Sequence, residues 1–328
     1  MFTDFQDKSL LAFSGGPDSV FLFHKLVEEG KVFDIAIVDY GLREQSKEEV
    51  AYAKALSDQH GITCFVKSAR SSGNFSESMG RKIRYDFFRK IVEEGGYSQL
   101  LTGHQLNDQI EWLFMQMSKG AGLTEMLGLK NVSVNRGLKV VRPILNYSKD
   151  EVLEYLDTHS IQYFIDESNN TDIYTRNKFR NSFVNEFVSA NQDGIKKSLS
   201  YLHKDKSMLE SNLSVDSIQL EDLYVANISG RKDEEIVRIV DKSLKERGIV
   251  MTNGARQTLL KDNKLEVGSS RVNVLRAGDF IYIYPKETGG KPIPKEVKSV
   301  FKTAKIPPGI RKYIYKTNTY ESLLKFVI

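Results

Sequence analysis

The sequence predicts an α/β fold, a doubly wound parallel sheet, followed by a smaller mixed α+β region. Two observations lead to this expectation. Short apolar runs alternate with amphipathic stretches over residues 8–118, and a glycine-rich turn follows the first apolar run. Such alternation is typical of parallel strands joined by helices. Because ligands of these sheets bind at the carboxyl ends of the strands, each strand end is a candidate position for functional side chains.

Four strands and four helices are expected in this alternating part. The apolar runs place strands near 8–13, 33–38, 62–66 and 98–102. The amphipathic stretches place helices near 17–30, 46–60, 77–94 and 107–118.

Composition points to a cytoplasmic protein without a membrane partner. The chain has 328 residues, of which 40% are hydrophobic and 27% charged. It contains no apolar run of about 18 residues, the length that a membrane span requires. The first residues do not combine a basic region with an apolar one, so no signal peptide is expected. Cys64 is the only cysteine, which excludes an internal disulfide and a CxxC metal site.

The first strand end carries the most specific motif. Residues 14–19 read Ser-Gly-Gly-Pro-Asp-Ser, here called the glycine-rich loop, and they join a strand to a helix. Its glycines allow close approach of a ligand, and the helix N-terminus favours an anion. The loop lacks the lysine of the GxxxxGK[ST] motif, and a plain turn is the alternative interpretation. The expected nucleotide-binding residues are Ser14, Gly15, Gly16, Pro17, Asp18 and Ser19, with Asp18 also a catalytic candidate.

The second and third strand ends offer weaker candidates. Asp39 could face the nucleotide or a metal ion, and Arg43 a phosphate. Arg81 and Arg84 lie three residues apart, so they share one face of the expected helix and could contact RNA. Surface turn residues and a solvated helix face are the alternative interpretations.

The fourth strand end combines a histidine with two carboxylates. His104 could donate a hydrogen bond to a phosphate or to the adenylate. Asp108 and Glu111 lie three residues apart at a helix start, so their side chains share a face. Paired carboxylates suit Mg²⁺, which prefers oxygen ligands. We therefore expect Asp108 and Glu111 to be catalytic metal ligands, although acids are also common at helix N-termini because of the helix dipole.

Basic residues later in the chain suggest a polyanionic partner. A polar loop before residue 176 leads into a basic helix, in which Arg176 and Arg180 share a face. Side chains of this kind suit nucleic-acid phosphates. Besides Arg81 and Arg84, the expected nucleic-acid-binding residues are Lys119, Arg142, Arg176, Asn177 and Arg180.

Charge divides the chain into two expected domains. Residues 1–195 hold 22 Lys and Arg against 27 Asp and Glu, whereas residues 196–328 hold 25 against 16. We expect a catalytic domain over 1–195 and a basic region over 196–328 that binds a polyanionic partner. The latter should be helical to about 262 and strand-rich to about 284, with a basic, aromatic tail suited to RNA. A solvated surface rich in lysine is the alternative.

The motifs together resemble the bacterial tRNA(Ile)-lysidine synthetase family of PP-loop ATP pyrophosphatases. The resemblance covers about residues 8–190 and includes, in order, SGGPDS, GLR, GRxxRY, GHxxxDQxE, KGAGL, RPIL and DESNxxxxxxRNxxR. It implies that ATP, with Mg²⁺, adenylates C2 of the wobble cytidine of a CAU-anticodon isoleucine tRNA and releases pyrophosphate. Free L-lysine then displaces AMP to give lysidine, which switches codon recognition from AUG to AUA.

Two alternatives remain open at this point. One is another PP-loop ATP pyrophosphatase, either a tRNA thiolase or a small-molecule amide ligase. The other is a non-catalytic RNA-binding protein with a relic PP-loop. The sequence also leaves the oligomeric state open, including a homodimer.

Several positions depart from the usual pattern of that family. Because position 107 lacks the usual aspartate, Asp108 and Glu111 must carry more of the metal binding. The departures are Ile37 and Tyr40 where histidine is usual, Gly80 for alanine, Asn107 for aspartate, Trp112 for threonine, and Lys119 for arginine.

Overall fold

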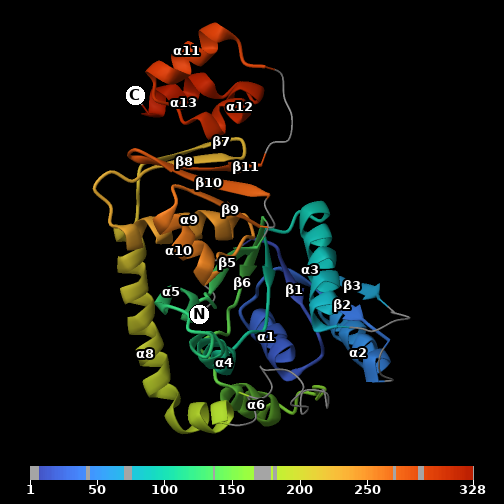
Figure 1. Cartoon of the computed structure of the whole chain (residues 1–328). Coiled ribbons are helices and arrows are strands. Elements are labelled where there is room, and N and C mark those ends of the chain that lie inside the picture. The colour runs from blue at the N-terminus through green and yellow to red at the C-terminus, as the bar shows by residue number, and fades with distance from the viewer. Residues whose placement is uncertain are drawn as a thin grey trace. The chain divides into compact units, whose positions relative to one another are not determined.

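The computed structural model divides the chain into two compact units, Met1–Lys206 and Ser207–Ile328. It describes residues 7–41, 45–69, 76–135, 137–165, 179, 183–268, 271–286 and 292–327. The division lies inside helix α8 (Asn185–Asn212), whereas the charge pattern placed it at 195/196. Each unit has its own sheet and its own core, and each is described by itself (Figure 1).

A six-stranded sheet forms the centre of the first unit, in the order β3-β2-β1-β4-β6-β5. All neighbouring strands are parallel except the β5–β6 pair at one edge, which is antiparallel. The predicted parallel α/β sheet is thereby confirmed. The strands are β1 (Ser9–Ala12), β2 (Phe33–Asp39), β3 (Cys64–Ser68), β4 (Gln99–Leu101), β5 (Val132–Asn135) and β6 (Leu138–Val141).

Helices follow the strands and begin where the sequence provides start signals. Pro17 occupies the first position of α1, where a missing N–H costs nothing. The Ser76 hydroxyl accepts the Met79 N–H at the start of α3, and Ser148 begins α6 with a capping box. The helices are α1 (Pro17–Glu28), α2 (Gln45–His60), α3 (Glu77–Glu94), α4 (Leu106–Met117), α5 (Leu123–Met126), α6 (Lys149–Thr158) and α8.

Both faces of this sheet are buried, which is what makes it doubly wound. Successive side chains of a strand point to opposite faces. Leu11 therefore packs with Phe21 of α1 in one core cluster, while Leu10 packs with Phe88 of α3 in another. The uninterrupted apolar runs of the sequence reflect this two-sided burial, since a strand with one solvated face would alternate.

A polar network lies at the end of the sheet where the strands begin, opposite their carboxyl ends. Asp34, which is buried, accepts the Tyr97 hydroxyl at 2.6 Å and the Thr63 N–H at 2.5 Å, and it pairs with the Lys8 ammonium at 2.7 Å. Burial would raise the pKa of Asp34, but these three partners lower it overall. The network ties the starts of β1, β2 and β3 to the turn before β4.

The second unit is a five-stranded antiparallel sheet covered on both faces. Its order is β7-β8-β11-β10-β9. Ile281 and Ile283 face the cluster with α9 and α10, while Tyr282 and Tyr284 face the cluster with α11, α12 and α13. The elements are β7 (Ser217–Leu220), β8 (Leu223–Asn227), α9 (Asp233–Glu246), α10 (Asn253–Lys261), β9 (Lys264–Val267), β10 (Val272–Ala277), β11 (Phe280–Pro285), α11 (Lys295–Thr303), α12 (Pro308–Lys316) and α13 (Tyr320–Val327).

Two expectations for this unit need correction. The segment 196–262 is not helical throughout, because it contains the β7–β8 hairpin. The tail aromatics do not form an exposed stacking surface. Tyr313 is buried, and Tyr315, Tyr320 and Phe326 pack against the same apolar cluster. The strands that the alternating pattern predicts between 265 and 284 are present as β9, β10 and β11.

In the described part of the chain, none of the helices combines the length and apolar character needed to traverse a membrane.

The Asp34 network predicts a specific pH dependence of stability. A carboxyl whose pKa is lowered on folding adds stability above its unfolded pKa of about 4 and loses it as the pH falls. We expect Asp34→Asn to cost about 1–3 kcal/mol at pH 7 and less at pH 3, measured by urea unfolding at both values. Lys8→Met is the control and should cost under about 1 kcal/mol, because Lys8 is partly exposed. An equal cost of Asp34→Asn at both values would exclude the ionised carboxylate as the cause.

Candidate active site

The glycine-rich loop is held in shape by its own two serines. The Ser19 hydroxyl donates to the Gly16 carbonyl at 3.0 Å and accepts the Ser14 N–H at 3.2 Å. The hydroxyls of Ser14 and Ser19 lie 3.2 Å apart. Gly15 has φ +77°, a left-handed conformation that favours glycine. The first turn of α1 has no side-chain cap among the described residues, so the loop and helix start are suited to an anion.

The loop lies directly against the end of β4. A Cβ atom on Gly103 would be 3.0 Å from the carbonyl carbon and oxygen of Asp18 and 3.1 Å from the Ser19 nitrogen. A side chain at position 103 would require the neighbouring backbone to shift by a few tenths of an ångström, which glycine avoids. Since β1 and β4 are neighbours in the sheet, their carboxyl ends converge, and Gly103 lets the following loops touch. The predicted nucleotide loop and the predicted acid–histidine cluster therefore belong to one site.

Residues 104–111 form the start of α4 and are mostly buried. Thr102 Oγ1 and His104 Nδ1 are hydrogen-bonded at 2.9 Å, which orients the imidazole. Asp108 Oδ2 accepts the Gln105 N–H at 2.9 Å, so this carboxylate also caps the helix. Glu111 has no exposed surface and Asp108 is only 6% exposed. Two carboxylates would supply only part of the coordination shell of a metal ion. Mg²⁺ beside phosphates is commonly bound in this way, with few protein ligands.

No larger metal centre exists in the portion of the chain that is described, where no three His, Cys, Asp or Glu side chains gather suitably. Asp108 and Glu111 offer only oxygen donors, and they lie in the first turns of α4, which follows the contact of Gly103 with the glycine-rich loop. This set fits Mg²⁺ bound jointly with a polyphosphate, since Mg²⁺ keeps several non-protein ligands.

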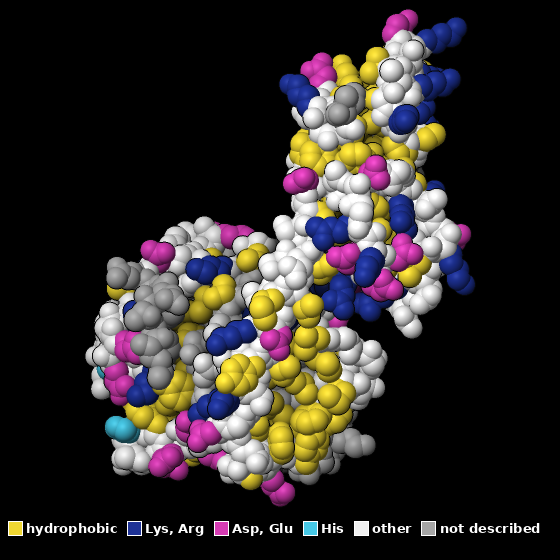
Figure 2. Space-filling model, turned by 90° about the vertical axis from the view of Figure 1, so that its left-hand side faces the viewer, with side chains coloured by type: hydrophobic (Ala, Val, Ile, Leu, Met, Phe, Trp, Pro, Cys, Tyr) yellow, Lys and Arg dark blue, Asp and Glu magenta, His cyan; other side chains and the backbone are white. Residues whose placement is uncertain are grey.

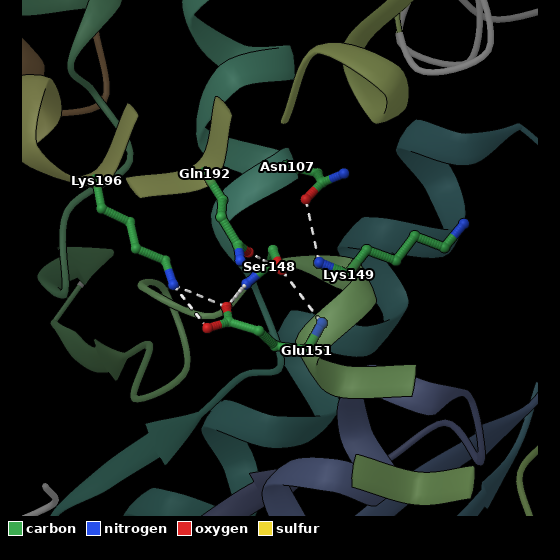
Figure 3. Close-up of polar contacts among 6 residues, drawn as sticks. All are labelled: Asn107, Ser148, Lys149, Glu151, Gln192 and Lys196. Atoms are coloured by element: carbon green, nitrogen blue, oxygen red, sulfur yellow. Dashed lines mark hydrogen bonds and ion pairs between the residues drawn. The ribbon is translucent and has the colours of Figure 1, made fainter. Parts of the chain in front are cut away.

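Asn107, where the family pattern has a second aspartate, joins three helices, and its contact with Lys149 is drawn in Figure 3. Its Oδ1 accepts the Lys149 N–H at 3.2 Å, and its Nδ2 donates to Asn185 Oδ1 at 3.0 Å. The start of α6 is held further by α8. The Ser148 hydroxyl donates to Gln192 at 2.9 Å, and Lys196 pairs with Glu151 at 2.7 Å. Position 107 is thus a structural junction here, and its amide supplies the donor that an ionised carboxylate lacks.

The departures at positions 40 and 80 contact each other. The Tyr40 hydroxyl donates to the Gly80 carbonyl at 2.9 Å, and the Arg84 guanidinium lies 6.0 Å from the Tyr40 ring centre. Tyr40 therefore links the end of β2 to the start of α3. The family pattern has a histidine at position 40. In this chain the Tyr40 hydroxyl hydrogen-bonds to buried Gly80 instead.

The predicted basic residues occupy different environments. Arg81 and Lys119 are exposed, and Arg84 is half-buried against Tyr40. Arg142 is buried, and its guanidinium donates to the Lys130 carbonyl and the Ser133 hydroxyl at 2.8 and 2.9 Å.

Arg142 lies close enough to Asp108 for their charges to interact. Burial lowers the pKa of Arg142; Tyr85 and Asp108 oppose this shift and Arg81 adds to it. Its two hydrogen bonds fix the connection before β6, so this arginine already has partners inside the protein.

Asp39 lies at the end of β2 and holds the following turn. Its Oδ1 accepts the Gly41 N–H at 2.7 Å, and its carbonyl accepts the Ala69 N–H at 2.7 Å. The remaining predicted residues, Arg43, Arg176, Asn177 and Arg180, lie outside the described residues.

Sequence reasoning missed two residues that shape the site. Gly103 is part of a recognised motif, but its role in the contact with Asp18 depends on the sheet order. Phe164 follows α6, and its N–H donates to the Gly15 carbonyl at 2.9 Å, while its ring lies 3.3 Å from the position of a Cβ on Gly15. No motif precedes it, so no local signal could have revealed this contact.

The parallel sheet, the glycine-rich loop and its two neighbouring strand ends define a nucleotide-binding protein of the PP-loop class. In agreement, the family described as the PP-loop domain matches residues 2–187. A solved U34-tRNA thiolase, NcsA from Methanococcus maripaludis, shares the fold with a TM-score of 0.50 and 19% identity, covering 62% of this chain and 72% of that one.

Relatives of similar length identify the family more narrowly. The chain is 35% identical to the tRNA(Ile)-lysidine synthase of Wolinella succinogenes, covering 94% of this chain and 93% of that protein. It is 36% identical to the same enzyme of Campylobacter jejuni, with coverages of 97% and 96%. With that of Helicobacter pylori the identity is 31%, with coverages of 98% and 94%. The chain belongs to the tRNA(Ile)-lysidine synthase family.

The contact at Gly103 predicts a localised loss of stability and nucleotide affinity. In Gly103→Ala the added methyl must displace the backbone of Asp18 and Ser19, so we expect unfolding to require about 1–3 kcal/mol less free energy. ATP binding should weaken, as measured by calorimetry. Gly194→Ala is the matched control, because nothing lies within 4 Å of its Cβ position in α8. It should be neutral or stabilising by up to about 1 kcal/mol. Equal effects of the two variants would refute the contact.

Proposed function

We propose that this chain ligates L-lysine to C2 of the wobble cytidine in a CAU-anticodon isoleucine tRNA, at the expense of ATP. The observation that carries the proposal is the match of 35–36% identity to tRNA(Ile)-lysidine synthases over more than nine-tenths of both chains. The C2 oxygen attacks the α-phosphorus and pyrophosphate leaves. The lysine amine then attacks C2, and AMP departs with the oxygen.

The glycine-rich loop would hold the leaving pyrophosphate. Ser14 and Ser19 offer hydroxyls, and the start of α1 offers backbone N–H groups in a fixed arrangement. Mg²⁺ would neutralise phosphate charge when bound, with Asp108 and Glu111 as its ligands. Asp18 and Asp39 border the same sheet edge, and His104, oriented by Thr102, would donate to a phosphate or adenylate oxygen.

The tRNA would contact exposed cations of both units. Arg81 and Lys119 favour this role through their exposure, and Arg84 lies three residues after Arg81 on α3. In the second unit, residues 286–328 carry 10 Lys and Arg against 3 Asp and Glu. Lys and Arg side chains line one edge at the top of Figure 2, where Figure 1 places α11 and α13. Since the tail aromatics are packed inside, this surface would act through phosphate contacts rather than base stacking.

Other parts of the proposal remain predictions from the sequence. They are the division of labour between a catalytic domain and a basic tRNA-binding region, the contribution of Arg43, Arg142, Arg176, Asn177 and Arg180, a cytoplasmic location, and a homodimer.

A thiolase is less well supported as an alternative. The thiolase similarity of 19% reflects the fold alone. Cys64 is the single cysteine, it lies on β3, and burial raises the pKa of its thiol. A half-buried thiol with a raised pKa is a poor nucleophile and metal ligand.

The first test is tRNA-dependent pyrophosphate release together with transfer of radiolabelled lysine to tRNA(Ile). We expect Asp18→Ala and Ser14→Ala to lower both rates on the order of 100-fold or more, with tRNA affinity nearly unchanged. Asp58→Ala, an exposed position on α2, is the matched control and should retain activity. Near-normal pyrophosphate release by either loop variant would argue against the loop assignment. Absence of lysine transfer by the unmodified chain would refute the proposed function itself.

The second test concerns Mg²⁺. Because Asp108 also caps α4, Asp108→Asn is preferable to alanine, since the amide oxygen keeps the cap. We expect Asp108→Asn and Glu111→Gln to need about tenfold more Mg²⁺ for half-maximal pyrophosphate release, as loss of a ligating carboxylate weakens the site. Pyrophosphate release measured without lysine should show the same increase in the Mg²⁺ requirement. An unchanged Mg²⁺ titration in both variants would remove these residues as ligands.

A further inference from the structure

A buried lysine ends the first unit. Lys206 of α8 is 3% exposed, and its ammonium donates to the carbonyls of Thr124 and Leu127 at 2.7 and 2.8 Å. Burying an ammonium is unfavourable unless its hydrogen bonds are met, so this contact fixes the two carbonyls firmly. Lys206 lies beyond the PP-loop match, which ends at residue 187, and outside every motif of the sequence.

Thr124 belongs to α5, a helix of four residues that lies beside α8 in Figure 1, and Leu127 is the residue that ends this helix. The last carbonyls of a helix have no partner within it. Glu125 supplies its carbonyl to the Trp112 indole N–H at 2.9 Å. A Cβ on Gly128 would lie 2.8 Å from that indole nitrogen, so glycine there makes room for the ring. Side chains from α4 and α8 thus hold α5 from two directions.

α5 in turn fixes the loop 118–122, which carries Lys119. At its start, the Lys119 and Ala121 N–H groups donate to the Gln116 carbonyl, both at 3.1 Å. At its end, Gly122 begins α5, where its carbonyl accepts the Met126 N–H at 3.0 Å. Gly120 has φ +72° in between. Both ends of the loop therefore depend on how α4 and α5 are placed.

We propose that Lys206 is a positioning residue for the tRNA, acting through α5 and Lys119. The Lys206 ammonium and the Trp112 indole together fix the position of α5 and therefore of loop 118–122. This position determines which phosphate of the tRNA the Lys119 ammonium contacts. This inference rests on the proposed function. It assigns a role to Trp112, the departure from the family pattern that the chemistry itself leaves unexplained. The described contacts of the glycine-rich loop involve neither Lys206 nor α5, so nucleotide binding should not depend on Lys206.

The test is steady-state lysine transfer with tRNA and ATP varied separately. We expect Lys206→Met to raise the KM for tRNA about 5- to 50-fold, because misplaced contacts weaken productive binding. The KM for ATP should stay within about twofold. Lys54→Met is the control, since it removes the same charge from an exposed position on α2, outside the region expected to bind tRNA; it should leave the KM for tRNA within about twofold. Trp112→Phe keeps an aromatic ring but removes the indole N–H together with the pyrrole part of the side chain, and it should change the KM for tRNA in the same direction as Lys206→Met.

A double variant separates positioning from general structure. If Lys206 acts through Lys119, then adding Lys206→Met to Lys119→Ala should raise the KM for tRNA by less than about twofold further, since coupled residues are not additive. A full multiplicative effect would refute the proposal, as would an unchanged KM for tRNA in Lys206→Met or an equal rise of both KM values. Should Lys206→Met fail to fold, Trp112→Phe decides by the same criteria. Lysine transfer by the unmodified chain is measured first, so failure of the proposed function is distinguished from failure of this inference.

Discussion

The active site depends on two backbone segments that touch. Gly103 after β4 and the first turn of α1 approach so closely that a methyl group at 103 would lie 3.0–3.1 Å from backbone atoms of Asp18 and Ser19, tighter than ordinary van der Waals contact. This approach follows from the sheet order, because β1 and β4 are hydrogen-bonded neighbours and their carboxyl ends meet. Everything attributed to the site, from the anion-binding loop to the buried acids of α4, requires that these two segments stay in register.

Helices α6 and α8 brace this arrangement from outside the sheet. Asn107 connects α4 to the start of α6 and to Asn185 of α8. The Glu151–Lys196 pair then ties α6 to the same helix. The acids of α4 therefore sit on an element whose position is set by hydrogen bonds and not only by apolar packing. This explains how the chain accommodates an amide in place of a carboxylate.

The sequence predicted what local pattern can encode. Two-sided burial produces unbroken apolar strands such as Leu10–Leu11, and the glycine-rich loop follows the first of them, so the sheet and the nucleotide site were recognisable. The β7–β8 hairpin was missed because β7 has only four residues, alternately exposed and half-buried, which is too short a run to stand out from its surroundings. The tail tyrosines were assigned to RNA because only the tertiary structure reveals that Tyr313 is buried. Phe164 and Lys206 act over long sequence separations, which no spacing rule can detect.

The Asp34 network lies at the opposite edge of the sheet from the chemistry. Part of the folding stability therefore comes from side chains at the end of the strands opposite to the candidate active site. Lineages adapting to warmer or colder habitats could strengthen or relax the one edge while the other stays fixed. A protein engineer seeking a more robust variant would, for the same reason, begin with the amino-terminal edge and leave the loops at the carboxyl edge untouched.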